Sequence, residues 1–116
     1  MDALKTGALR GRLVKRRNVI VTTLEYVENQ RRAVREHADW KDQFSYLSRE
    51  NLLNYLESWY QKEIGQIDRA LDRIGDNKYG VCMGCNGPIE SEWLESFPET
   101  EFCRACHNLW ERMNRG

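Results

Sequence analysis

The sequence has no long run of apolar residues. Its longest aliphatic run is Val19-Ile20-Val21, whereas a membrane-spanning helix needs about 20 apolar residues and the apolar part of a signal peptide needs at least about seven. We therefore expect neither a membrane span nor a secretion signal, and hence a cytoplasmic protein. With 116 residues, of which 31% are charged and 41% hydrophobic, the chain has the length and composition of one soluble domain.

The chain also lacks net charge, because 18 basic residues balance 18 acidic ones. No overall field therefore attracts it to nucleic acid or to an anionic membrane. Locally the balance is uneven: residues 1–37 contain nine Lys/Arg against four Asp/Glu, a surplus of five, and residues 76–116 contain four against seven, a deficit of three. The basic stretch from Arg10 to Arg17 is either a contact surface for an acidic partner or a solvated helix face.

Catalytic signatures are absent too. The sequence contains no glycine-rich phosphate loop and no H-E-x-x-H motif. It has two histidines, of which His107 follows a cysteine and His37 is distant from every cysteine in the sequence. We therefore do not expect this chain to be an enzyme.

Proline is absent from the first 87 residues, and apolar residues recur there every seven positions. Two series have this spacing: Leu13, Ile20, Val27 and Val34, and then Leu53, Tyr60, Ile67 and Ile74. They predict two long amphipathic helices, over about 4–36 and 48–74. Ser48 is the expected N-cap of the second helix, and Gly75 is its expected C-terminal stop.

Each predicted helix is too long to fold alone against a small core. A 33-residue helix reaches roughly 50 Å and needs an equally long partner. We therefore expect a mainly α protein in which residues 1–76 form a long antiparallel coiled-coil hairpin with its tip near 37–47. Arg17, Arg31 and Glu63 interrupt the apolar seam, and we interpret them as register marks or partly exposed side chains.

The four cysteines all lie in the last third of the chain, as Cys82-x-x-Cys85 and Cys103-x-x-Cys106 with 17 residues between the pairs. This spacing is typical of a tetrahedral zinc site, because each pair can bind one ion from a single turn. Four thiolates leave no open position, so one such Zn²⁺ would be structural. Two disulfides are the alternative, which a reducing cytoplasm disfavours. Oxidation of the same thiols, with release of the metal, would make a redox switch.

Residues 77–116 are rich in glycine and contain both prolines, so we expect a loop-rich segment that depends on the metal for its fold. A short closing helix is expected over about 107–115, with Leu109, Trp110 and Met113 on its apolar side. We expect His107 to be a surface or packing histidine, because four cysteines already saturate the ion. The expected packing tryptophans are Trp59 at the hairpin seam, and Trp93 and Trp110 around the zinc segment.

The predicted tip reads Asp39-Trp40-Lys41-Asp42-Gln43-Phe44. Asp39 and Asp42 are three residues apart, a spacing at which carboxylates often cap the following helix. Paired carboxylates can also hold a divalent cation. Trp40 and Phe44 are aromatic residues among polar neighbours, and we expect them to contact a partner.

Together these segments resemble the DksA/TraR family of bacterial transcription regulators. The zinc segment carries the resemblance through Tyr79-Gly80-x-Cys82-x-x-Cys85, Ile89, Leu94, Pro98 and Cys103-x-x-Cys106. The hairpin precedes this segment as in the family, and Asp39 and Asp42 correspond to the aspartates of the family's D-x-x-D-x-A tip motif. Phe44 stands where that motif has alanine, and Asn86 where the family usually has glycine.

The resemblance implies a monomeric factor that binds RNA polymerase directly. Family members insert the hairpin into the secondary channel, bring the tip aspartates near the catalytic magnesium and modulate initiation without contacting promoter DNA to find their targets. Asp39 and Asp42 would be the effector residues, with zinc fixing the base against the polymerase. The basic residues by which DksA binds ppGpp align with Gln66, Phe97 and His107, which weakens the expectation of ppGpp sensitivity through that site.

Two other functions remain open from the residues alone. One is a zinc-finger module that binds nucleic acid directly through the stretch from Arg10 to Arg17, although the zinc segment itself is acidic. The other is a thiol-based redox sensor whose hairpin changes partner when the metal is released.

Overall fold

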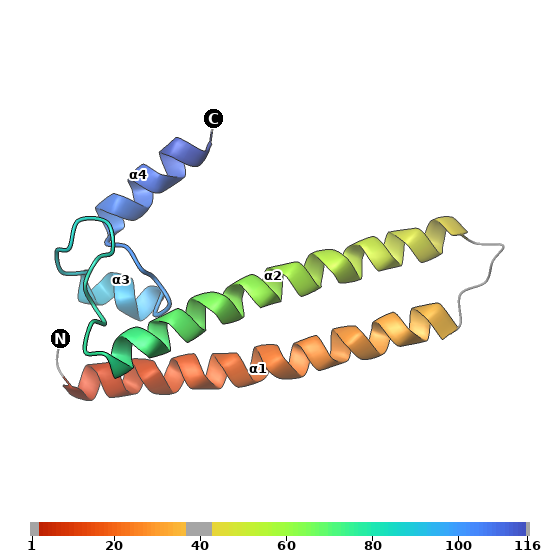
Figure 1. The fold of residues 1–116 in the computed structure, drawn as a ribbon, viewed down its shortest axis with the longest axis horizontal. Helices are drawn as coiled ribbons and strands as arrows, with labels where there is room; N and C mark the ends of the chain where they lie inside the picture. Colours follow the sequence, from red (N-terminus) through yellow and green to blue (C-terminus); the bar gives the residue numbers. More distant parts are fainter. Residues whose placement is uncertain (1–2, 37–42, 116) are drawn as a thin grey trace. The chain divides into compact units, whose positions relative to one another are not determined.

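The computed structural model of the chain describes residues 3–36 and 43–115, without the side chains of residues 43–46. Four helices follow one another in this part, α1 (Ala3–Glu36), α2 (Gln43–Gly75), α3 (Ser91–Ser96) and α4 (Arg104–Asn114) (Figure 1). The expected mainly α fold is confirmed: a hairpin of two long helices is followed by a four-cysteine segment and a C-terminal helix. Among the described helices, none combines the length and the apolar character that a bilayer crossing requires.

The second long helix begins earlier than the sequence predicts. It starts at Gln43, five residues before Ser48, so Ser48 lies inside α2 and the prediction that it is the N-cap is wrong. No glycine or proline interrupts residues 43–47, and nothing in their local chemistry stops a helix. The prediction failed there because the seven-residue apolar series begins only at Leu53.

The end of α2 lies at Gly75 as predicted, but another residue makes the stop. Asn77 adopts the left-handed conformation with φ 58°. Its amide donates to the carbonyl oxygen of Ile74 at 3.2 Å, and the amide of Lys78 donates to that of Arg73 at 2.8 Å. These two bonds form a Schellman motif, in which Asn takes the position that is usually glycine.

Two short helices complete the four-cysteine segment. The sequence did not predict α3, because six residues are too few to show a helical period, although Leu94 at its centre is buried. The closing helix α4 begins at Arg104, three residues before the expected start at His107.

The chain forms two compact units. The hairpin unit comprises residues 16–65, and the base unit comprises residues 1–15 and 66–116. Each unit contains part of α1 and part of α2, and each is described by itself below.

The hairpin unit is held together by an apolar seam. Ile20, Val27 and Leu53, three positions of the seven-residue series, are buried. Trp59 is not part of this seam: its side chain is 58% exposed, so the prediction that it packs there is wrong. It immediately precedes Tyr60, which is a seam position, and one residue rotates a side chain by about 100° around the helix axis.

Ion pairs fix the register of the two helices in the hairpin unit. The pairs are Arg16–Glu63, Arg31–Glu57 and Arg35–Glu50. As the residue number rises along α1, that of the partner on α2 falls, as an antiparallel arrangement requires. Glu63 accepts two hydrogen bonds from Arg16, at 2.6 and 3.0 Å. Arg31 and Glu63, which interrupt the apolar series in the sequence, are therefore paired, in agreement with their interpretation as register marks.

The base unit has its own buried cluster. Its members come from α1, from the two cysteine pairs, from the segment before α3 and from α3 itself: Leu9, Cys82, Ile89, Leu94 and Cys103. Trp93 packs against this cluster as expected. Helix α4, in contrast, has no buried residue, and Leu109, Trp110 and Met113 are all exposed. The prediction that Trp110 packs around the cysteine segment is wrong, because its side chain is 51% exposed.

Candidate metal centre

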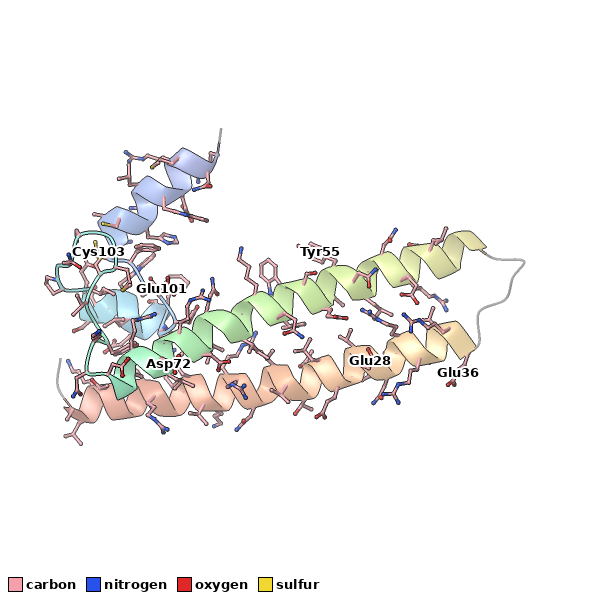
Figure 2. The ribbon with its side chains drawn as sticks, viewed as in Figure 1. Glu28, Glu36, Tyr55, Asp72, Glu101 and Cys103 are labelled. Atoms are coloured by element: carbon pink, nitrogen blue, oxygen red, sulfur yellow. The ribbon has the colours of Figure 1, made fainter. Side chains whose placement is uncertain are left out.

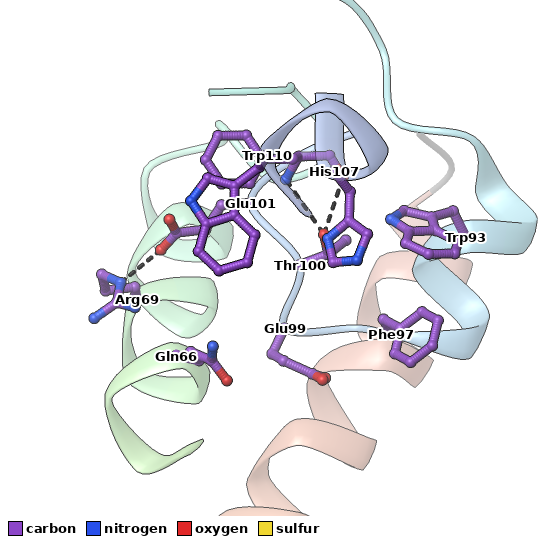
Figure 3. Close-up of a pocket in the computed structure, with 10 residues that line it drawn as sticks. Gln66, Arg69, Trp93, Phe97, Glu99, Thr100, Glu101, His107 and Trp110 are labelled. Carbon is purple, nitrogen blue, oxygen red and sulfur yellow. Dashed lines mark hydrogen bonds and ion pairs between the residues drawn. The ribbon is translucent and has the colours of Figure 1, made fainter. Parts of the chain in front are cut away.

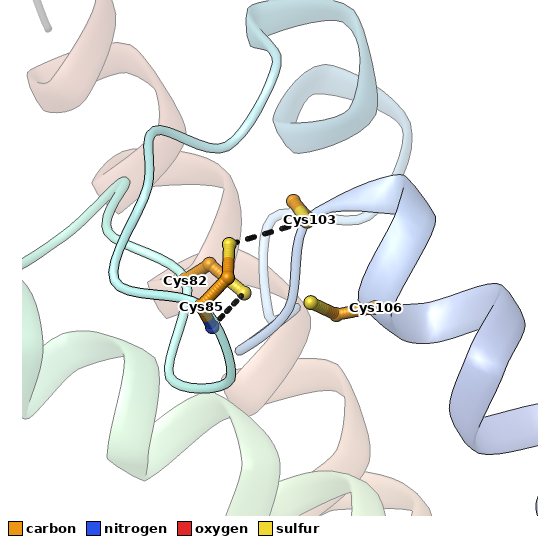
Figure 4. A group of neighbouring side chains, drawn as sticks. All are labelled: Cys82, Cys85, Cys103 and Cys106. Atoms are coloured by element: carbon orange, nitrogen blue, oxygen red, sulfur yellow. Dashed lines mark hydrogen bonds between the residues drawn. The ribbon is translucent and has the colours of Figure 1, made fainter.

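Two turns of the base unit bring the four cysteines together (Figure 4). All four Sγ atoms lie within 4.8 Å of one another, and those of Cys85 and Cys103 are 3.9 Å apart. A tetrahedral ion with metal–sulfur bonds of about 2.3 Å requires sulfur atoms about 3.8 Å apart. The four thiols are therefore arranged to bind a metal ion.

Backbone hydrogen bonds shape the turn that carries Cys82 and Cys85. The amide of Cys82 donates to the carbonyl oxygen of Gly87 at 2.8 Å, and the amide of Asn86 donates to that of Cys82 at 2.9 Å. Asn86 has φ 61°, a left-handed conformation that asparagine tolerates better than most residues. Asparagine in place of the family's usual glycine is thus compatible with the turn.

The same turn directs backbone amides at the sulfur of Cys82. The amides of Gly84 and Cys85 lie 3.3 and 3.5 Å from it. Burial opposes ionisation of this thiol, but hydrogen bonds from the amides of Cys103, Cys85 and Gly84 outweigh it and lower its pKa to about 6. The turn is therefore prepared to present Cys82 as a thiolate, the form that binds metal.

The second cysteine pair lies at the start of α4. Cys103 is the N-cap residue of this helix, and Cys106 follows in its first turn. A carboxylate oxygen of Glu90 accepts a hydrogen bond from the amide of Arg104 at 3.2 Å. Hydrogen bonds from the amides of Glu90 itself and of Arg104 lower the pKa of the Glu90 carboxyl. Glu90 thus ties the chain before α3 to the helix that carries Cys106.

The four thiols influence one another's ionisation. Hydrogen bonding with Cys103 and Cys82 raises the pKa of Cys106 to about 12. A bound cation would allow all four sulfurs to ionise, because it compensates their mutual repulsion. Such a site has four sulfur donors and no open position.

His107 is not in the sulfur cluster. Its Nε2 lies 3.0 Å from a carboxylate oxygen of Glu111, and its ring packs against Trp93 with centroids 5.3 Å apart. This is the packing role that the sequence predicts.

A cavity of about 200 Å³ lies beside this histidine (Figure 3). Gln66, Phe97 and His107 all line it, so the structure brings these three residues together. Trp93 of α3, Trp110 of α4 and Phe102 also line it. Arg69, the one Lys or Arg among the described lining residues, is paired with Glu101.

The predicted effector tip cannot be assessed in the same way. Asp39 and Asp42 lie outside the described residues, as does Trp40. Of Phe44, the structure describes only the backbone, at the second position of α2. The roles of Asp39, Asp42 and Phe44 stay predictions.

Part of the basic stretch in α1 is engaged within the molecule. In the base unit, Arg12 donates to the carbonyl oxygen of Glu95 at 2.7 Å. In the hairpin unit, Arg16 is bound to Glu63. These contacts reduce the number of cations available for phosphate groups, while Arg10 and Lys15 remain exposed.

A hairpin of long helices followed by four cysteines that are arranged to bind a metal ion defines the class of protein to which this chain belongs. No family model matches the chain. An uncharacterized protein of Aquifex aeolicus (strain VF5) is 30% identical over 103 residues, which cover 86% of this chain and 71% of that protein. The chain belongs to the same family as this Aquifex protein.

A solved structure resembles the whole chain. The transcription factor DksA2 from Pseudomonas aeruginosa matches with a TM-score of 0.89 and 23% identity, over 100% of this chain and 90% of that one. The chain therefore has the DksA fold. The resemblance to the DksA/TraR family that the sequence indicates is confirmed for the fold and for the four-cysteine cluster.

Proposed function

We propose that this protein is a DksA-like transcription regulator that binds bacterial RNA polymerase directly. It inserts the tip of its hairpin into the secondary channel and modulates initiation, and Asp39 and Asp42 are its effector residues. It acts in the cytoplasm as a monomer, without catalytic activity of its own and without sequence-specific DNA binding. Residues 1–76 are the coiled-coil hairpin that carries the tip, and residues 77–116 are the zinc-finger segment with the C-terminal helix.

One observation carries this proposal: the chain shares its fold over its full length with a protein that is a transcription factor. The tip motif adds a second line of support that is independent of the fold. Asp39 and Asp42 have the spacing of the family's aspartates and lie in the sequence between the two long helices. A helical hairpin is suited to this task because it carries a small charged segment far from the surface that anchors it.

We further propose that the four cysteines hold one structural Zn²⁺. Cys82, Cys85, Cys103 and Cys106 are the ligands, and the base unit depends on the ion because its apolar cluster is small. Native mass spectrometry should find one zinc per chain. Removal of the metal by a chelator should disorder the base unit, which amide NMR signals of residues 79–110 would report. A base unit that keeps its NMR spectrum without metal would contradict a structural role.

The test of the tip uses the variant Asp39→Asn/Asp42→Asn. We expect the wild-type protein to bind purified core RNA polymerase and to change the lifetime of open complexes on a stable-RNA promoter. The double variant should bind with wild-type affinity and lose most of the effect on lifetime. The matched control is Glu25→Gln/Glu28→Gln, which removes the same charge from two exposed carboxylates of α1 that are also three residues apart.

Two outcomes would overturn these assignments. If the wild-type protein does not bind polymerase, the proposed function is wrong. If the double variant acts like the wild type, the assignment of the tip aspartates as effector residues is wrong. If the protein instead shifts DNA in a gel, and this binding weakens steeply with salt, direct nucleic-acid binding is the better explanation.

A further inference from the structure

An exposed apolar stripe runs along α2 within the hairpin unit. It consists of Leu52, Tyr55 and Trp59, whose exposed fractions are 57, 63 and 58%. Their spacing of three and four residues places them on successive turns of one helix face. The rings of Tyr55 and Trp59 are stacked, with centroids 6.4 Å apart. Figure 2 shows Tyr55 on the side of α2 that is turned away from α1.

The surface around this stripe has unusually little charge for a chain in which 31% of the residues are charged. Between positions 51 and 61, the other exposed residues are all uncharged: Asn51, Asn54, Ser58 and Gln61. Glu57 is the one ionisable acid in this range, and its carboxylate is paired with Arg31. A helix face that contacts only solvent is usually rich in charged residues. Contact with solvent therefore does not explain the low charge of this surface.

A cation lies at each end of the stripe. Arg49 and Lys62 are exposed, and neither has an ion pair within the described part of the chain. They are 13 residues apart, which corresponds to about 20 Å along a helix. The surface therefore has an apolar middle and a positive charge at either end.

This charge pattern selects among the possible occupants. Two copies of the chain that pair by their stripes would bring cations together in either direction: Arg49 would meet Arg49 when the helices run parallel and Lys62 when they run antiparallel. Nucleic acid requires a series of cations at the spacing of its phosphates, which an uncharged stretch of about 20 Å does not offer. A different protein, with an apolar groove and carboxylates near both ends, satisfies the whole pattern.

We propose that this stripe docks into such an apolar, acid-flanked groove on a protein partner. This inference rests on the function proposed above, so the partner is RNA polymerase. The stripe is the part of the hairpin that binds the wall of the secondary channel. Large aromatic side chains at the centre of an interface commonly dominate its affinity. The stripe thus supplies affinity, and the tip supplies the effect on initiation.

The test measures the equilibrium binding of the full chain, loaded with zinc, to purified bacterial core RNA polymerase. The variant Tyr55→Ser/Trp59→Ser should weaken binding at least tenfold. The matched control is Val19→Ser/Tyr26→Ser, which removes two exposed apolar side chains from α1 and should change binding less than twofold. Circular dichroism confirms that both variants keep their helices.

Charge reversal tests the ends of the stripe. Arg49→Glu and Lys62→Glu should each weaken binding severalfold, whereas Arg49→Lys should preserve it. Glu36→Lys, which reverses an exposed charge of α1, serves as the control for charge reversal as such.

The outcomes separate this inference from the function on which it rests. If the wild type fails to bind polymerase, the proposed function is wrong and the inference falls with it. If the wild type binds and the stripe variant binds equally well, the function stands and the inference is overturned. Unchanged binding by both charge-reversed variants overturns the acid-flanked groove. Dimerisation of the wild type that the stripe variant abolishes, measured by analytical ultracentrifugation, would identify a second copy as the occupant and also overturn the proposal.

Discussion

Glu101, which lies two residues before Cys103, accepts a hydrogen bond of 2.5 Å from Arg69 of α2. The same carboxylate lies 3.4 Å from Arg73. The backbone carbonyl oxygen of Glu101 accepts a hydrogen bond from the amide of Met83, in the first cysteine turn, at 2.8 Å. One residue therefore links α2 to both cysteine pairs of the base unit.

We predict that Glu101→Gln lowers the free energy of unfolding by about 1 kcal/mol, because it removes a carboxylate shared by two arginines. Urea denaturation of the zinc-loaded protein measures this change. Glu92→Gln is the matched control, since Glu92 is an exposed acid of α3 without an ion pair among the described residues. It should change stability by less than about 0.5 kcal/mol. Equal effects of the two substitutions would contradict the linking role of Glu101.

Tyr79 should make stability depend on pH in the alkaline range. Burial raises the pKa of its hydroxyl to about 12, compared with about 10 in an unfolded chain. Because the folded state favours the neutral form, the contribution of this group is fully present below about pH 10 and is lost as the pH rises toward about 12.

The variant Tyr79→Phe should lack the part of the alkaline loss of stability that is due to Tyr79. Unfolding measurements between pH 9 and 12 would show this. At neutral pH it should cost about 1 kcal/mol, because the hydroxyl donates to the carbonyl oxygen of Pro98 at 2.9 Å. Tyr26→Phe, at an exposed position of α1, should leave both the stability and the pH profile unchanged. An alkaline profile of Tyr79→Phe that matches the wild type would refute the assignment.

Substitution by alanine should have different effects at two glycines: it should weaken zinc retention at Gly84 and raise stability at Gly11. At Gly84, a Cβ atom would lie 3.2 Å from the sulfur of Cys106, which a bound metal would hold in place. Gly84→Ala should therefore release zinc faster to a competing chelator. At Gly11 of α1, a Cβ atom would meet nothing within 4 Å, so Gly11→Ala should stabilise the protein by about 1 kcal/mol. Unchanged zinc release by Gly84→Ala would show that the cysteine turns can move apart.

The cavity beside His107 should not bind a polyphosphate. Its lining contains Glu99 and Glu101 against Arg69, which is already paired. We expect ppGpp to bind neither the free protein nor its complex with polymerase through this cavity, as calorimetry and an equilibrium binding assay would show. The variant Arg69→Ala shows whether any observed binding of ppGpp takes place in this cavity or elsewhere on the protein. Binding of ppGpp that this substitution abolishes would contradict the prediction.

The sequence was informative wherever a pattern repeats or a chemical requirement is strict. The spacing of Leu13, Ile20 and Val27 predicted a buried seam, because the seven-residue repeat keeps one face of a helix toward its partner. The pairing of two C-x-x-C motifs predicted four converging thiols, because few other arrangements use that spacing. In contrast, the start of α2 and the short helix α3 carried no repeat and were missed.

Other wrong predictions concerned which large apolar side chains are exposed. Trp59 and Trp110 were expected to pack because they are large and apolar, yet both are more than half exposed. Position relative to the seam decides burial for Trp59, and a one-residue offset was enough to bring it to the surface. For α4, the apolar character of Trp110 and Met113 gave no information on whether another element covers them.

By itself, the amino-acid sequence determined the two long helices, their antiparallel pairing and the convergence of the four cysteines, because these follow from periodicity and cysteine spacing along the chain. Only the tertiary structure decided that Asn77 ends α2, that Gln66, Phe97 and His107 line one cavity, and that Leu52, Tyr55 and Trp59 form an exposed stripe. The reason is that these features depend on backbone conformation and on distances between segments far apart in the chain, and neither is encoded in a local pattern.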